Sequence, residues 1–412
     1  MLANINLEQA LDSILGFINP LPGESISLLQ AHDRVAYHDL SATRDLPPYP
    51  QACLDGYAFH VDDLGQRNSF RIQECLRNGD LPGSPLIPGQ TVGVVTGGPL
   101  PGGTGAVIAQ ELVTVDGDRV FFSGSVGTSQ ASNIKPPGED FRAGDLLARS
   151  GTRLDPGLLA VLAAFGKSEV PVYRRPRVIV LSLGSEIVPC HTTPKPGQIW
   201  DSNGPLLASL VTRDGGQVIG VMAAREQKDG GVKEHLKKML QHADIVLTIG
   251  GGAAGVCDNA LSDLREMGAK ILFWGVQIKP GSHTGAAIWD SKLILSLSGN
   301  PGACAVGYQL LAAPVIRAFQ ALNPYPHRIS ALCVDPFPKK GGPRRFLRGL
   351  ATCHQDGWRV SLQPGQKNSM LRSLIGCNAL VELPAGHPPL EPESQVSVLL
   401  INPSHSAKDA LT

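Results

Sequence analysis

The sequence lacks three features that direct proteins to membranes, to the secretory route or to nucleic acids. No apolar run reaches the ~18 residues that a membrane-spanning helix needs. Residues 1–8 contain no basic segment followed by an apolar core, so we expect no secretory signal. Lys plus Arg and Asp plus Glu number 36 each, so no net charge attracts DNA or an anionic membrane. We therefore expect a cytoplasmic protein without nucleic-acid or membrane partners.

Paired cysteines and aromatic residues are also scarce. The eight cysteines form no C-x-x-C pair, which argues against a zinc site or a disulfide framework and favours reduced thiols. Aromatic residues make up only 5% of the chain, whereas it contains 47 glycines and 33 prolines. This composition predicts many turns and short strands.

One local basic cluster stands out against the neutral background. It consists of Lys339, Lys340, Arg344, Arg345 and Arg348. A short charged segment of this kind is usually a solvated loop, so we expect it at the surface rather than at a nucleic acid.

The chain is long enough, at 412 residues, for two to four domains. Short β runs broken by glycine and proline over residues 43–141 predict a β-rich insertion domain. The flanking segments 1–42 and 142–172 contain two amphipathic helices, capped by Asn6 and Asp155, and predict one helical linker domain. Residues 327–412 contain short strands that predict a carboxyl-terminal β domain.

Between them, residues 173–323 alternate strand and helix patterns. The strands are expected at 177–183, 217–223, 244–249, 270–274, 286–289 and 293–297, and the helices at 205–212, 232–242, 260–267 and 303–322. This alternation predicts an α/β domain with a parallel sheet and helices on both of its faces.

Glycine-rich loops follow three strands of this domain. They contain Gly184-Ser185-Glu186, the run from Gly250 and Gly251 to Asp258, and Gly299-Asn300-Pro301. Ligands of open α/β sheets bind at the carboxyl ends of strands, where helix amino termini favour anions. Such a loop is also consistent with a simple tight turn.

Glu186, Asp201 and Asp258 therefore converge at one edge of the predicted sheet, where two carboxylates with water suit Mg²⁺. Lys279 would bind phosphate. In the alternative interpretation Asp201 is only a helix cap and Glu186 only a turn residue. In the insertion domain, Asp55, Thr96 and Asp140 lie in glycine-bearing turns, whose composition alone does not define a site.

Eleven short motifs occur in an order and spacing that resemble one family. They are Leu-Asp-Gly-Tyr-Ala (54–58), Val-Thr-Gly-Gly-Pro-Leu-Pro (95–101), Ala-Val-Ile-Ala-Gln-Glu (106–111), Pro-Gly-Glu-Asp-Phe (137–141), Ala-Gly-Asp (143–145), Gly-Thr-Arg-Leu (151–154), Val-Pro-Val-Tyr-Arg-Arg-Pro-Arg-Val (170–178), Asp-Ser-Asn (201–203), Lys-Pro-Gly (279–281), Gly-Asn-Pro (299–301) and Gln-Lys-Asn-Ser (366–369). On these motifs the chain is similar, over nearly its whole length, to the molybdopterin molybdenumtransferases, that is the MoeA proteins and gephyrin E domains.

The resemblance implies a four-part subunit with a carboxyl-terminal β-barrel, in an elongated homodimer that works beside other proteins of molybdenum cofactor biosynthesis. It implies molybdenum insertion from molybdate into adenylylated molybdopterin, with Mg²⁺ and release of AMP. By position, Glu186 and Asp258 match Mg²⁺ ligands. Asp55, Asp140, Asp201 and Lys279 match catalytic positions. The implied substrate-binding positions are Thr96, Gly184, Ser185, Gly250, Gly251, Gly299, Asn300, Pro301 and Ser369.

Four loops depart from the family pattern. Ser185 replaces an acid, residues 250–258 lose a serine and an acid, His283 ends a motif that loses a lysine, and Ala303 replaces a serine. Each lost charge-assisted hydrogen bond removes roughly 1.5–3 kcal/mol. The leading hypothesis is therefore an active transferase, and the alternative is a catalytically impaired paralogue that carries molybdopterin or serves as a scaffold. A generic nucleotide binder fits less well, because the glycine loop has neither G-x-G-x-x-G order nor a following Walker lysine.

Overall fold

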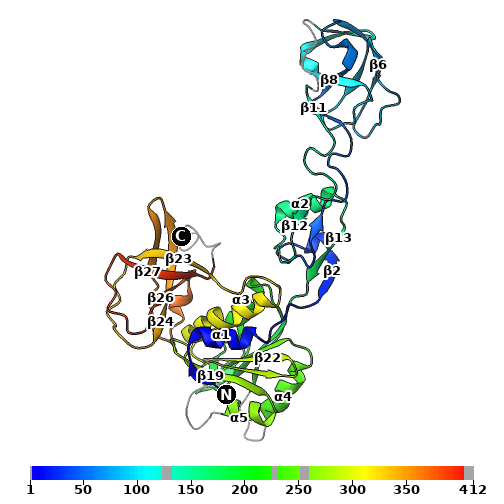
Figure 1. Cartoon of the computed structure of the whole chain (residues 1–412). Coiled ribbons are helices and arrows are strands. Elements are labelled where there is room, and N and C mark those ends of the chain that lie inside the picture. The colour runs from blue at the N-terminus through cyan, green and yellow to red at the C-terminus, as the bar shows by residue number, and fades with distance from the viewer. Residues whose placement is uncertain (1, 123–131, 225–230, 251–258, 403–412) are drawn as a thin grey trace.

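The computed structural model describes residues 2–122, 132–224, 231–250 and 259–402. Figure 1 shows an elongated chain, with the insertion domain at one end and the α/β domain at the other. The linker domain lies between them, and the carboxyl-terminal domain lies beside the α/β domain (Figure 1). Within the described residues, no helix is both long and apolar enough to cross a membrane.

The α/β domain is built on a seven-stranded sheet. In spatial order the strands are β1 (Leu2–Ile5), β19 (Lys270–Val276), β21 (Gly285–Trp289), β22 (Lys292–Leu297), β18 (Ile245–Ile249), β14 (Arg177–Leu183) and β17 (Gln217–Ala224). Every residue of β18 is buried, as expected of a central strand covered on both faces.

Helices cover both faces of this sheet, as predicted. One face packs on α1 (Leu7–Leu15), α3 (Asn203–Arg213) and a helical stretch formed by α6 (Pro301–Gly307), a π-helical segment (Tyr308–Ala312) and α7 (Ala313–Ala318). The other face packs on α4 (Gly231–Leu240) and α5 (Asn259–Glu266). The long helix predicted over 303–322 therefore begins at Pro301 and contains a π segment.

The prediction of a purely parallel sheet is wrong at one strand. β21 runs antiparallel to both β19 and β22. The reason is the connection to β22, where only Asp290 and Ser291 intervene and both have positive φ, 47° and 60°. A two-residue connection of this kind forms a hairpin, and a hairpin is necessarily antiparallel.

Residues 2–15 belong structurally to the α/β domain. β1 pairs in parallel with β19, and α1 packs in the core cluster of the central sheet through Leu7, Leu11 and Ile14. Asn6 caps α1 and forms the predicted capping box with Gln9. The sequence placed these residues in the linker domain, because it contained no signal for the short exposed strand that precedes the helix.

The linker and insertion domains are joined by two antiparallel chain segments. In the linker domain β2 (Gly23–Ser27) pairs with β13 (Glu169–Tyr173), β3 (Leu40–Ser41) pairs with β12 (Leu146–Ala148), and α2 is Pro156–Ala164. Towards the insertion domain, the N–H of Ala42 donates to Asp145 O at 2.8 Å and that of Leu46 donates to Phe141 O at 2.8 Å. The chain thus leaves the linker domain and returns at the same place.

The insertion domain is a six-stranded sheet with an added ribbon. Its strands in spatial order are β8 (Thr104–Ala109), β5 (Gly56–His60), β7 (Gln90–Val94), β6 (Ser69–Cys75), β10 (Arg119–Phe122) and β9 (Val113–Asp116), and the ribbon pairs β4 (Gln51–Ala52) with β11 (Ile134–Lys135).

The carboxyl-terminal domain is the predicted β-barrel. Five strands close in the order β24 (Arg344–His354), β25 (Gly357–Leu362), β23 (His327–Cys333), β27 (Ser394–Leu400) and β26 (Ala379–Leu383), which returns to β24. The short strand β20 (Ile278–Lys279) of the α/β domain pairs in parallel with β24 and joins the two domains.

Candidate functional site

Leu183, Gly250 and Gly299, at the carboxyl ends of β14, β18 and β22, lie side by side, as predicted for adjacent parallel strands. Gly250 has φ +89°, and a Cβ added there would lie 2.8 Å from the carbonyl oxygen of Leu183. A Cβ added to Gly299 would lie 3.5 Å from the Cα of Gly250. Because a Cβ at Gly250 would clash with the backbone of Leu183 and φ is positive, only glycine fits there.

Asp201 ties this edge to α3. Its Oδ2 accepts a hydrogen bond from the hydroxyl of Ser182, at the end of β14, at 2.7 Å. Its Oδ1 accepts from the backbone N–H of Gly204 at 2.8 Å, as the carboxylate of a helix cap does. Asp201 is only 7% exposed. Both oxygens are therefore engaged within the protein, and the carboxylate positions the edge as well as capping the helix.

Asn203 connects α3 to the third loop. Its Nδ2 donates to the carbonyl oxygen of Gly299 at 2.7 Å. Its Oδ1 is buried and has no hydrogen-bond partner within the described residues. The sequence identified Asn203 only as the last residue of the Asp-Ser-Asn motif. Its position two residues after Asp201, at the start of a helix, is the signal that could have singled it out.

Glu186 lies on the exposed loop after β14. Its carboxylate folds back over Gly184, where an added Cβ would lie 2.7 Å from Oε2. The neighbouring Ser185 is also exposed. Gly251 and Asp258 lie outside the described residues, so the pairing of Glu186 with Asp258 stays a prediction. Within the described residues, no group of three or more His, Cys, Asp and Glu side chains has the arrangement of a metal site.

The start of α6 lies beside a loop of the β-barrel. Asn300 precedes Pro301, the first residue of the helix. The N–H of Gly302 donates to the carbonyl oxygen of Asn368 at 2.8 Å, which brings the exposed Ser369 to the same edge. A Cβ on Gly302 would lie 3.0 Å from that oxygen. The glycine therefore allows the barrel loop to approach the helix.

Arg348 is a residue whose place the sequence misassigned. It was expected with Arg345 in a solvated basic loop, but Arg345 is 8% and Arg348 1% exposed. The reason is that both lie on β24, which pairs with β25 on one side and β26 on the other. Basic composition alone could not reveal that these arginines belong to a barrel strand.

The guanidinium of Arg348 holds the barrel loop that carries Ser369. Its Nε donates to the hydroxyl of Ser373 at 3.0 Å, and its Nη2 to the carbonyl oxygens of Gly365 at 3.1 Å and Lys367 at 3.2 Å. Burial lowers the pKa of Arg348. Its Nη1 is buried without a partner in the described part of the chain. Because a Cβ on Gly302 would lie 3.3 Å from Nη2, this cation is next to the start of α6.

Lys279 reaches the same region from β20. Its side chain is exposed, and the loop that follows approaches α6, because a Cβ on Gly281 would lie 3.5 Å from the carbonyl oxygen of Ala303. The structure therefore places around one sheet edge the predicted residues Gly184, Gly250, Gly299, Asn300, Pro301 and Asp201, and the segments that carry Lys279 and Ser369 approach the start of α6 there.

The remaining predicted residues form two pairs in the insertion domain. Asp55 Oδ1 accepts from the backbone N–H of Thr96 at 2.7 Å and from its hydroxyl at 2.8 Å. These bonds, the backbone one first, lower the pKa of Asp55. Asp140 pairs with Lys135 at 2.6 Å and thereby raises the pKa of that lysine. Figure 1 shows the insertion domain at the opposite end of the molecule from the α/β domain. A single chain therefore does not bring the insertion-domain residues to the sheet edge.

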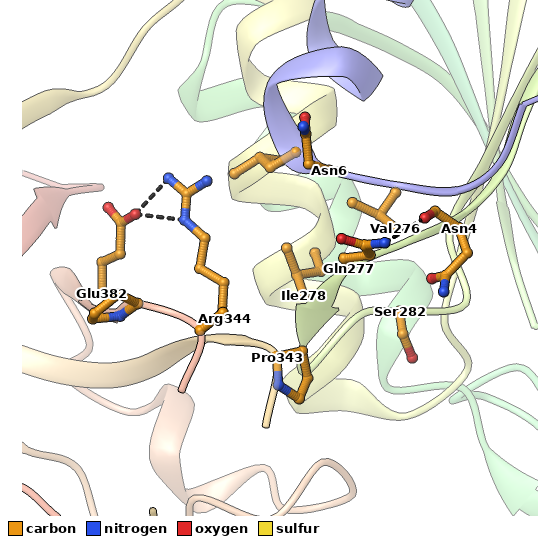
Figure 2. A pocket seen from close by; sticks show the side chains of 12 residues that line it. Asn4, Asn6, Val276, Gln277, Ile278, Ser282, Pro343, Arg344 and Glu382 are labelled. Carbon is orange, nitrogen blue, oxygen red and sulfur yellow. Dashed lines mark hydrogen bonds and ion pairs between the residues drawn. The ribbon is translucent and has the colours of Figure 1, made fainter. Parts of the chain in front are cut away.

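A groove of about 610 Å³ lies elsewhere, between α1, the β19–β20 connection and the barrel. Figure 2 shows Asn4, Asn6 and Gln277 on one side of it and the ion pair of Arg344 with Glu382 on the other. None of the predicted site residues lines it.

Comparisons with known proteins agree with this domain organisation. The MoeA N-terminal region (domain I and II) matches residues 5–166, the probable molybdopterin binding domain matches residues 179–318, and the MoeA C-terminal region (domain IV) matches residues 330–401.

Relatives match the chain over almost its full length. The molybdopterin molybdenumtransferase of Bacillus subtilis is 31% identical over 417 residues, which cover 98% of this chain and 96% of the relative. That of Staphylococcus aureus is 29% identical over 99% of this chain and 98% of the relative. A crystal structure of the molybdopterin biosynthesis protein MoeA of Pyrococcus horikoshii has a TM-score of 0.84 and 27% identity, covering 97% of this chain and 99% of that one. This chain therefore belongs to the molybdopterin molybdenumtransferase (MoeA) family.

Proposed function

We propose that the protein inserts molybdenum from molybdate into adenylylated molybdopterin and releases AMP. The observation that carries this proposal is the gathering of anion-binding groups around the glycine loops. Nη1 of Arg348 is buried without a partner among the described residues, α6 begins beside this guanidinium, and the exposed Lys279 and Ser369 lie on segments that approach α6. Phosphate and molybdate are both oxoanions, and helix starts, arginine and lysine are the groups that bind oxoanions in proteins.

The glycine loops are suited to the nucleotide. Gly250 and Gly299 have no side chains to keep a phosphate from the backbone, and they lie near each other at the ends of two neighbouring strands. Lys279 offsets phosphate charge, and Ser369 offers a hydroxyl donor. Asp201, Asn203 and Gly299 set the distance between α3 and the third loop.

Glu186 fits a Mg²⁺ ligand. It is an exposed carboxylate beside the glycine loops, and Mg²⁺ is held by one or two carboxylates together with water and substrate phosphates. Asp258 is the second carboxylate of the proposal. When bound, the metal polarises the phosphoanhydride as a Lewis acid.

A second copy of the chain completes the proposed site. The insertion domain, which carries Asp55, Thr96 and Asp140, lies at the opposite end of the molecule from the α/β domain of its own chain (Figure 1). In a homodimer the insertion domain of one copy faces the sheet edge of its partner and brings these residues to the substrate. An isologous pair of this kind contains two equivalent sites.

The test is release of AMP from adenylylated molybdopterin by the purified protein with Mg²⁺ and molybdate. We expect turnover that needs both ions and that falls at least about tenfold in Lys279→Ala, which removes a charge-assisted contact to phosphate. The matched control is Lys339→Ala, an exposed lysine outside the site. AMP at the background level would reject the enzyme.

The alternative is a paralogue that binds molybdopterin without turnover. Two features favour it. Ala303 lacks the hydroxyl of the family pattern, and Gly302 lets the barrel loop close onto α6. Tight binding of adenylylated molybdopterin without AMP release would select this carrier function.

A further inference from the structure

Asn203 has an unused acceptor at the sheet edge. The side chain is 8% exposed, and its Nδ2 is committed to the carbonyl oxygen of Gly299 at 2.7 Å. This bond fixes the orientation of the amide, because the opposite orientation would set two oxygens against each other. Oδ1 therefore points away from Gly299, and it has no partner among the described residues.

A buried carbonyl without a hydrogen bond is costly, so such a group points to a missing donor. The neighbouring acceptors are already engaged, since both oxygens of Asp201 accept hydrogen bonds from Ser182 and Gly204. Asn203 lies between α3 and the loops of Gly250 and Gly299, the edge assigned above to the nucleotide.

We infer that Oδ1 of Asn203 accepts a hydrogen bond from a neutral N–H or O–H donor of the nucleotide and so selects its nucleoside part. An amide oxygen has no donor, so it attracts neither phosphate nor molybdate, which carry only acceptor oxygens when ionised. Asn203 is therefore a specificity residue for the nucleoside and not an anion-binding residue. The inference rests on the proposed function.

The test measures binding of AMP, purine riboside 5′-monophosphate, 2′-deoxy-AMP and 3′-deoxy-AMP to wild-type protein and to Asn203→Leu by calorimetry. Each analogue lacks one donor, either the amino group of the base or one ribose hydroxyl. We expect the wild type to bind one analogue about tenfold more weakly than AMP, the effect of one unpaired hydrogen bond. Asn203→Leu should bind AMP and that analogue equally.

Several outcomes would overturn the inference. In one, Asn203→Leu lowers the affinity for AMP and for all analogues by the same factor, as a purely structural role beside Gly299 would. If the wild type binds AMP but does not discriminate among the analogues, Asn203 has no donor on the nucleoside. If the wild type does not bind AMP, the proposed function fails as well.

Two controls keep the test interpretable. Ser209→Ala lies on the exposed side of the same helix, where the hydroxyl only contacts the carbonyl oxygen of Pro205, and it should change no affinity. If Asn203→Leu does not fold, the smaller Asn203→Ser replaces it. Asn203→Ser must then lose the same discrimination, and retention of the wild-type preference would overturn the inference.

Discussion

The hydroxyl of Ser182 donates a hydrogen bond of 2.7 Å to the buried carboxylate of Asp201. This bond joins the end of β14 to the start of α3, and the second oxygen of Asp201 binds the N–H of Gly204. The two bonds together hold a helix start against the glycine loops. The arrangement makes Asp201 important for stability as well as for the site.

Replacing Asp201 should destabilise the fold more than replacing its partner does. Asp201→Ala removes both bonds and should lower the free energy of unfolding by about 3 kcal/mol, since it also leaves a helix N–H unsatisfied. Ser182→Ala removes only one bond and should lower it by about 1 kcal/mol. Urea unfolding of both variants measures the difference. Equal losses would mean that the bond to Gly204 contributes nothing.

The buried guanidinium of Arg348 should be irreplaceable by lysine. Arg348 holds three acceptors of the barrel loop, and its Nη1 has no partner in the described residues, whereas an ammonium group cannot span this arrangement. Arg348→Lys should therefore weaken molybdate binding at least about tenfold, the effect of one lost charge-assisted bond. Calorimetry with molybdate checks this, and Lys340→Arg, at an exposed position, is the control. Wild-type affinity in Arg348→Lys would show that Arg348 has no part in oxoanion binding.

Such an arginine illustrates what the sequence could and could not predict. Strand positions followed from apolar runs, and the caps of α1 and α2 followed from Asn6 and Asp155, because these signals are local. The burial of Arg348 depends on which strands flank β24, and this pairing is a long-range relation that no local pattern encodes.

The same distinction applies to the candidate site. The side-by-side position of the ends of β14, β18 and β22 could be predicted, since adjacent parallel strands end at one edge. The free Oδ1 of Asn203 could not, because it depends on the direction of one amide towards Gly299. The antiparallel direction of β21 was not predicted, although the sequence contains the two-residue connection at Asp290 and Ser291.

Asp244 should make the protein sensitive to acid. Its carboxylate binds Arg174 through two bonds, at 2.9 and 3.0 Å, and accepts from the N–H of Arg177 at 2.8 Å. Burial of the carboxylate acts to raise its pKa. The hydrogen bonds and the charge of Arg174 outweigh this effect and lower the pKa of Asp244 below its ordinary value of 3.8. A lowered carboxyl pKa stabilises the folded state above the unfolded pKa, and this contribution is lost as the pH falls through the folded value.

Asp244→Asn should therefore be less stable than the wild type near pH 7, with the gap closing below about pH 4. Thermal unfolding between pH 7 and pH 3 measures the gap at each pH. Asp118→Asn is the control, because Asp118 is an exposed carboxylate that pairs with the exposed Arg71. A stability difference between Asp244→Asn and the wild type that does not change with pH would contradict the lowered pKa of Asp244.

Mixing two inactive variants should restore activity if two chains share each site. Asp55→Asn alters the insertion domain, where Asp55 binds Thr96, and Lys279→Ala alters the sheet edge. A mixed dimer contains one intact site, so random exchange of subunits should restore about a quarter of wild-type AMP release. The measurement is AMP release after subunit exchange, with each variant alone as the control. No recovery despite demonstrated exchange would show that each chain uses its own residues.

The paired segments that lead into the insertion domain have a consequence for how the chain can be cut. Leu46 and Phe141 lie side by side, hydrogen-bonded through Leu46 N–H at 2.8 Å, and the N–H of Asp140 returns a bond to Leu46 O at 3.0 Å. Deleting the ninety-odd residues between them leaves two chain ends that are close enough for a short turn to connect. The insertion domain can therefore be deleted while the linker domain keeps its fold.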